Sequence, residues 1–202
     1  TSGYKGVVVT ASKGVRTRTM VDEEEGGKKV TDPHAWQSLD NGRIYVRNIA
    51  DGLAAADPAH AAAYRKNAGM YLGRIGETEV RKMLGSVPKA ERKIITSHDA
   101  FGYFGDAYGL TLLSPQGLST EAEASARDVG ALIRQIKAEG IKALFVENMT
   151  DPRLVENIAK ETGAKPGGEL YADALSGPEG PAPTYLDMFR HNVTVLVKAL
   201  RP

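Results

Sequence analysis

Four side chains that could bind a metal ion or transfer a proton are spread widely along the chain: His34, His98, Glu147 and Asp173. Imidazole nitrogens and carboxylate oxygens suit zinc and the neighbouring divalent transition metals. Their wide separation is typical of a site assembled across a fold, since the sequence has no compact motif such as H-E-x-x-H. These residue types indicate a metal site, and the spacing alone leaves open that each is a hydrogen-bonded structural residue.

Three of these side chains lie where a predicted strand ends. The polar residues are His98, Glu147 and Asp173, and the apolar or β-branched runs before them are 93–97, 141–146 and 168–172. In open α/β sheets, ligands bind in the crevice beyond the carboxyl ends of the strands. If the three strands are parallel neighbours, the histidine and both carboxylates therefore face one crevice.

The second half of the chain alternates predicted strands with predicted helices. The order is strand 93–97, helix 100–107, strand 110–114, helix 120–139, strand 141–146, helix 152–162, strand 168–172 and helix 183–200. Thr120 with Glu123 forms a capping box, Asp151 can cap the next helix, and Gly140 and Gly163 stand where helices should end. This alternation predicts an α/β fold with a parallel sheet.

The first half of the chain has a different pattern. The apolar run 5–10 predicts a buried strand, and the polar segment 11–31 predicts a solvated loop. Asp32 can cap a helix, which would place His34 in the first helical turn. A second helix is expected from Asp57 to about residue 84, roughly 40 Å at 1.5 Å per residue, long enough to join two lobes.

Composition excludes several classes of function. The 202 residues are 42% hydrophobic and 25% charged, which is ordinary globular usage. The net charge of +1, from 26 basic and 25 acidic residues, gives no support to a nucleic-acid partner. There is no cysteine and no P-loop or G-x-G-x-x-G motif, so disulfides, thiolate ligands and nucleotide binding are not indicated. The chain begins with Thr1 rather than methionine, so the lack of a targeting signal carries no weight.

Five motifs in order along the chain carry a family resemblance. They are Asp32-Pro33-His34-Ala35-Trp36; Asp57-Pro58 with Tyr64 and Asn67; Thr96-Ser97-His98-Asp99-Ala100-Phe101-Gly102-Tyr103-Phe104 with Tyr108-Gly109; Phe145-Val146-Glu147; and Tyr171-Ala172-Asp173-Ala174-Leu175-Ser176. Together they resemble the zinc- and manganese-binding periplasmic receptors of ABC uptake systems, the TroA-like family with a helical backbone. The resemblance implies a C-terminal α/β lobe at 87–202 with a parallel sheet and flanking helices. It also implies a long bridging helix at 57–86 and a remnant of an N-terminal α/β lobe at 1–56.

The resemblance also implies roles for individual residues. His34, His98 and Asp173 match the metal ligands of the family, and Glu147 matches a glutamate that supports the ligands. Ser97, next to His98, and Arg153, six residues after Glu147, are expected to support the site with it. Two departures stand out. Family members begin with a lobe of several strands that supplies another histidine, and here only its last strand, 5–10, is expected. The loop at 21–27 also has no histidine-rich tract.

The expected function is therefore extracytoplasmic binding of a divalent transition metal for delivery to an ABC permease in the membrane. Zn²⁺ is favoured over Mn²⁺, because manganese receptors of the family tend to carry glutamate at the position of His98. The resemblance assigns no catalytic residue. Two alternatives remain: a metal-dependent hydrolase with the same ligands and Glu147 as general base, and a metal-binding surface adhesin.

Overall fold

The computed structural model of the protein describes residues 3, 5–22, 26–76, 79–114, 126–141 and 143–201. The elements of its first half are β1 (Thr19–Asp22), β2 (Lys28–Thr31), the 3₁₀ turn η1 (Ala35–Gln37), α1 (Leu39–Ala56), η2 (Pro58–His60) and α2 (Ala61–Gly76). Those of the second half are α3 (Val80–Gly85), η3 (Lys89–Glu91), β3 (Lys93–Ile95), α4 (Gly102–Tyr108), β4 (Thr111–Leu113), α5 (Ala126–Glu139), β5 (Ala143–Glu147), α6 (Pro152–Thr162), β6 (Lys165–Leu170) and α7 (Tyr185–Leu200).

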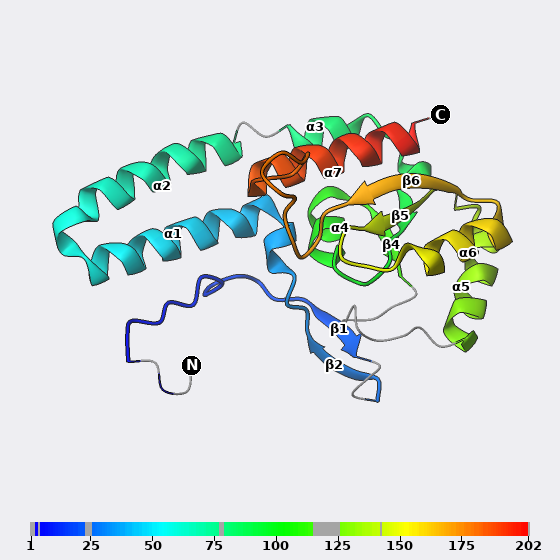
Figure 1. Ribbon diagram of the computed structural model, residues 1–202, viewed down its shortest axis with the longest axis horizontal. Coiled ribbons are helices and arrows are strands. Elements are labelled where there is room, and N and C mark those ends of the chain that lie inside the picture. The colour runs from blue at the N-terminus through cyan, green and yellow to red at the C-terminus, as the bar shows by residue number, and fades with distance from the viewer. Residues whose placement is uncertain are drawn as a thin grey trace.

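A four-stranded parallel sheet in the order β4-β3-β5-β6 forms the centre of the second half. Alternate side chains of the strands enter different cores, as the two-residue period of a strand requires. Ile94 and Phe145 pack in the core that includes α4 and α7, whereas Ile95 and Leu144 pack in the core that includes α5 and α6. Helices therefore cover both faces of the sheet (Figure 1), and the predicted α/β class is confirmed.

The edge strand β6 differs from the predicted strand 168–172. It begins earlier, because an edge position tolerates Pro166 and because Gly167 leaves room for Phe145, whose ring would lie 2.4 Å from a Cβ there. It also ends earlier. The backbone N–H of Tyr171 donates to Oδ1 of Asn192 at 2.9 Å, and Nδ2 of Asn192 donates to the carbonyl of Tyr171 at 2.8 Å. The backbone groups of Tyr171 thus bond to the Asn192 side chain, and β6 ends at Leu170.

Two predictions for the N-terminal segment were wrong. Residues 5–10 form no strand, and Val7 and Val8 are more than 60% exposed, because a strand needs a hydrogen-bonding neighbour that the described residues do not provide here. The segment instead runs past α1, where Val9 lies against Gly52. The expected loop 11–31 contains the antiparallel hairpin of β1 and β2, with Met20 opposite Val30.

The helices of the first half also depart from expectation. The structure has a 3₁₀ turn after His34 and starts α1 only after Ser38, so His34 precedes the helix rather than lying in its first turn. In place of one continuous helix over 57–86 it has η2, α2 and α3, with residues 77–78 outside the described part. Helices α1 and α2 lie side by side as a pair (Figure 1). The role of this segment as a bridge between lobes stays a prediction.

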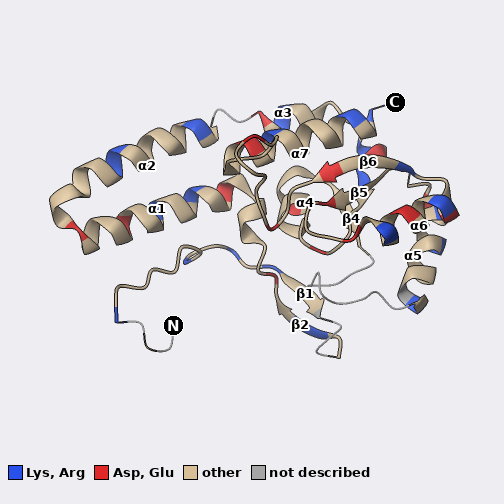
Figure 2. Cartoon of the chain, in the orientation of Figure 1, with Lys and Arg blue, Asp and Glu red and all other residues tan. Residues whose placement is uncertain are grey.

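The remaining predicted helices agree with the structure at the described residues. The Asp151 side chain accepts a hydrogen bond from the backbone N–H of Arg153 and so caps α6, while Gly140 and Gly163 end helices with positive φ angles of 63° and 75°. The predicted capping box of Thr120 and Glu123 lies outside the described residues. No helix in the described ranges has both the length and the apolar character for a membrane span. Both basic and acidic side chains lie along α1 and along α6 (Figure 2).

Replacing Asn192 with alanine should destabilise the fold by about 2–4 kcal/mol, because two buried backbone groups of Tyr171 would lose their partner. Urea unfolding of the metal-free protein measures this change. Thr194→Ala is the matched control on the same helix, since Thr194 is exposed and its hydroxyl donates to the carbonyl of Arg190 within the helix. That control should stay within about 0.5 kcal/mol of the parent. Equal stability of both variants would contradict this account of Asn192.

Candidate metal centre

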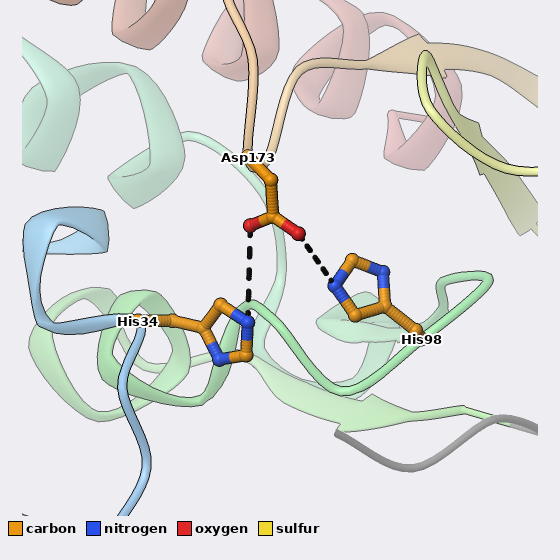
Figure 3. Close-up of side chains that lie close together, drawn as sticks. All are labelled: His34, His98 and Asp173. Atoms are coloured by element: carbon orange, nitrogen blue, oxygen red, sulfur yellow. Dashed lines mark ion pairs between the residues drawn. The ribbon is translucent and has the colours of Figure 1, made fainter. Parts of the chain in front are cut away.

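Three side chains from distant parts of the chain converge at the carboxyl edge of the sheet. His34 comes from the segment before η1, His98 from the loop after β3, and Asp173 from the loop after β6 (Figure 3). Oδ1 of Asp173 lies 3.8 Å from Nε2 of His34, and Oδ2 lies 3.1 Å from Nε2 of His98. One potential ligand atom from each residue lies within 4.8 Å of the others. The strands β3, β5 and β6 are parallel neighbours in the sheet, which is the condition under which the sequence predicted one shared crevice.

A buried carboxylate, Asp32, orients His34. Its Oδ1 lies 2.8 Å from Nδ1 of His34 and accepts the backbone N–H of the same residue at 2.9 Å. Oδ2 accepts a hydrogen bond from Nη1 of Arg18 at 2.7 Å. Burial alone would raise the pKa of Asp32, but the bonds from His34 and Arg18 outweigh it and hold the pKa below its usual range. The predicted role of Asp32 as a helix cap was wrong, because it faces the site.

Arg18 was not identified from the sequence, although its guanidinium binds the second oxygen of Asp32. Its guanidinium occupies the space beside Gly102, where a Cβ would lie 1.4 Å from Nη1. Its backbone N–H donates to the hydroxyl of Tyr103, which in turn donates to the carbonyl of Asp32. Arg18 lies 14 residues before Asp32 in the sequence, so no local motif links the two. Folding brings them together.

A second buried carboxylate, Glu147, orients His98 in the same way. Oε1 of Glu147 accepts the backbone N–H of His98 at 3.0 Å, and Oε2 lies 2.5 Å from Nδ1. The hydroxyl of Ser97 accepts the backbone N–H of Glu147 at 3.3 Å and the hydroxyl of Thr150 at 2.9 Å. Glu147 and Ser97 therefore lie where they can support the site.

Arg153 lies apart from this group. Its side chain is 83% exposed at the start of α6, where its guanidinium pairs with Asp151. The predicted supporting role for Arg153 does not agree with this position. Proximity in sequence to Glu147 was the reason for including it, but the bonds given for its guanidinium go to Asp151.

The electrostatics of the cluster are dominated by the contact between His98 and the two carboxylates. Burial alone would lower the pKa of His98, but the close carboxylates of Asp173 and Glu147 outweigh it and raise the pKa from 6.5 to about 9. Burial would likewise raise the pKa of Asp173, and the bond with His98 lowers it instead. In the metal-free protein, His98 therefore carries a proton at neutral pH and forms an ion pair with Asp173.

The arrangement fits a divalent transition metal. In both histidines Nδ1 faces a buried carboxylate, which leaves Nε2 directed towards Asp173. A carboxylate on the second ring nitrogen is the usual device that orients a metal-binding histidine. Two imidazole nitrogens with one carboxylate oxygen are a donor set that suits zinc and its neighbours. Fold and site together are those of an α/β protein that could hold a divalent ion at the carboxyl edge of a parallel sheet.

Comparison with known proteins extends this assignment. The chain belongs to the family described as the zinc-uptake complex component A, periplasmic, whose model matches residues 1–199. It is 34% identical over 171 residues to the iron-binding protein YfeA of Yersinia pestis, covering 84% of this chain and 55% of YfeA. It is 37% identical over 183 residues to the manganese-binding lipoprotein MntA of Bacillus subtilis, covering 87% of this chain and 60% of MntA. The chain thus spans little more than half the length of these relatives.

Solved structures give the same picture. A manganese-bound S38A mutant of a periplasmic metal-binding protein from Candidatus Liberibacter asiaticus superposes with a TM-score of 0.87 at 32% identity, over 96% of this chain and 72% of that one. A structure of TroA superposes with a TM-score of 0.88 at 31% identity, over 96% and 73% of the two chains. These relatives are binding proteins rather than enzymes.

The raised pKa of His98 predicts how stability depends on pH in the metal-free protein. The pKa in the folded state, about 9, lies above the unfolded value of 6.5, so the stabilisation is complete below pH 6.5 and is lost as pH rises to about 9. The size is on the order of 3 kcal/mol. Melting temperatures in chelator between pH 6 and 9.5 should fall for the parent and change much less for His98→Gln. Parallel curves would show that His98 is not the titrating group.

Proposed function

We propose that this protein binds a divalent transition-metal ion outside the cytoplasm and delivers it to the permease of an ABC importer. The convergence of His34, His98 and Asp173, with both imidazoles directing Nε2 towards the carboxylate of Asp173, is the observation that supports this most strongly. In this proposal the two histidines bind as neutral imidazoles and Asp173 binds as a carboxylate. Glu147 and Asp32 hold the rings in place.

The comparisons support the location and the partner. The family is described as periplasmic, and MntA is named as a lipoprotein. Relatives from Streptococcus are named as substrate-binding lipoproteins of metal ABC transporters. A membrane permease as the recipient of the ion follows from these names by analogy, so it belongs to the proposal. The adhesin alternative has no observation in its favour here.

The position of Glu147 argues against the hydrolase alternative. A general base must reach the proton of a water or substrate within hydrogen-bonding distance. Glu147 is 1% exposed, and its two oxygens face the backbone N–H and Nδ1 of His98. Both oxygens therefore contact His98, and Glu147 is not placed to accept a proton from a water or substrate. Orienting the ring is a role that a binding protein also needs.

Zinc is the metal that we propose, with manganese as the second choice. Two nitrogen donors favour Zn²⁺ over Mn²⁺. The names of the relatives point in several directions, since YfeA is named for iron and MntA for manganese. Because most such sites bind zinc more tightly than manganese in vitro, the comparison between variants is more informative than a single affinity.

The proposal predicts that zinc stabilises the folded protein. Binding to the native state alone adds about 2.7 kcal/mol at a hundredfold excess over Kd. The melting temperature should therefore rise with Zn²⁺ and fall back with chelator, and this response should be lost in His34→Ala and His98→Ala. His60→Ala is the control, because the side chain of His60 is 69% exposed and pairs with Asp57. An identical melt with zinc and with chelator in the parent would refute the metal proposal.

A substitution of His98 by glutamate should shift the preference from zinc towards manganese. The change replaces a nitrogen donor with oxygen at the same place, so zinc affinity should fall by at least about tenfold while manganese affinity falls less or rises. Calorimetry with each metal gives the ratio. His191→Glu is the control, because His191 contacts the backbone of Glu169 outside the cluster. If the ratio in His98→Glu matches that of the parent, His98 does not select the metal.

A further inference from the structure

Asp173 differs from the two histidines in how it is held. The side chains of His34 and His98 are 4% and 1% exposed, whereas that of Asp173 is 34% exposed. It lies in the loop between β6 and α7 rather than beside a buried carboxylate. The histidines are therefore fixed by the core, and the position of Asp173 depends on how its loop is anchored.

The anchor of this loop is the carbonyl of Ala172, directly before Asp173. That oxygen accepts two hydrogen bonds, from Nε1 of Trp36 at 3.0 Å and from Nε2 of Gln37 at 2.9 Å. Both donors follow His34 closely in the chain and belong to η1. The same short turn that presents His34 thus also holds the backbone beside Asp173.

The turn η1 is itself held by α7. The hydroxyl of Tyr185, on α7, donates to the carbonyl of Trp36 at 2.7 Å. Asn192, also on α7, holds the backbone of Tyr171. The anchor of Asp173 is therefore a closed frame of η1, α7 and residues 171–172, built from side-chain to backbone bonds.

A buried glutamine at position 37 is unfavourable for the stability of the fold. It is fully buried, and its Oε1 has no hydrogen-bond partner among the described residues. A buried polar atom without a partner destabilises a protein, and an apolar side chain of similar shape avoids this cost. The amide is explained by what its Nε2 does, which is to bind the carbonyl of Ala172.

We propose that Gln37, with Trp36, is a positioning residue that holds Asp173 against the two histidines and so sets the rate at which the metal ion leaves. This inference rests on the proposed metal-binding function. When the bond from Gln37 is lost, the loop samples more conformations, and Asp173 must be ordered each time an ion binds. The ion then dissociates faster, although no ligand has been changed.

The test is Gln37→Met, which keeps the size of the side chain and removes its polar atoms. Stability in urea without metal should be unchanged or higher, because the unpaired Oε1 is gone and Trp36 still bonds Ala172. Zn²⁺ dissociation, followed by stopped-flow mixing with a chromogenic chelator, should be about fivefold faster. A merely structural role for Gln37 would instead lower stability and leave dissociation unchanged.

Asn41→Ala is the matched control. Nδ2 of Asn41 also donates to the backbone of η1, at the carbonyl of Ala35, but it does not contact residues 171–173 among the described contacts. The rate of Zn²⁺ dissociation from Asn41→Ala should equal that of the parent. The double variant Trp36→Phe with Gln37→Met leaves the carbonyl of Ala172 without either donor and should release zinc faster than the product of the single effects predicts.

Two further measurements separate this inference from the function on which it rests. The visible spectrum of the Co²⁺ form should change in Gln37→Met, and amide hydrogen exchange at residues 173–175 should be faster. If the parent binds neither Zn²⁺ nor Co²⁺, the proposed function fails. If the parent binds both but Gln37→Met has the parent's dissociation rate, spectrum and exchange, the positioning role of Gln37 is overturned and the function stands.

Discussion

Two carboxylates buried beside two imidazoles set the main constraint on this structure. A buried carboxylate is costly unless charged or hydrogen-bonding groups surround it. Asp32 meets this condition through His34 and Arg18, and Glu147 meets it through His98. The end of β5, the loop after β3 and the segment before η1 must therefore lie in register with one another, because displacing any of them would leave a charge unpaired in the interior.

The parallel sheet and α7 meet this constraint in different ways. The adjacent strands β3, β5 and β6 end at one edge and deliver their polar residues there, which is a property of the topology. Helix α7 reaches the same edge from the side and binds backbone groups through Tyr185 and Asn192. The strands thus bring the candidate ligands near one another, and the helix fixes the loops beside them.

The sequence predicted those parts of the site that follow from local pattern and chain topology. His98, Glu147 and Asp173 follow strand-like runs, so their meeting could be anticipated from a parallel sheet. Asp32 was misread because Asp-Pro before an apolar stripe is equally typical of a helix cap. The predicted strand 5–10 failed because an apolar run indicates burial but does not supply the neighbouring strand that a sheet requires. Arg18 carries no local signal, since its partners are brought to it only by folding.

The close approach of Arg18 to Gly102 has a consequence for how sequences of this kind can change. A side chain at position 102 would require the guanidinium of Arg18 to move away from Asp32, so these two positions are expected to vary together rather than independently. Loss of the arginine frees position 102 to accept a larger residue, but it leaves Asp32 with one cationic neighbour fewer. We therefore expect a larger residue at position 102 to accompany a change at position 18 or at position 32.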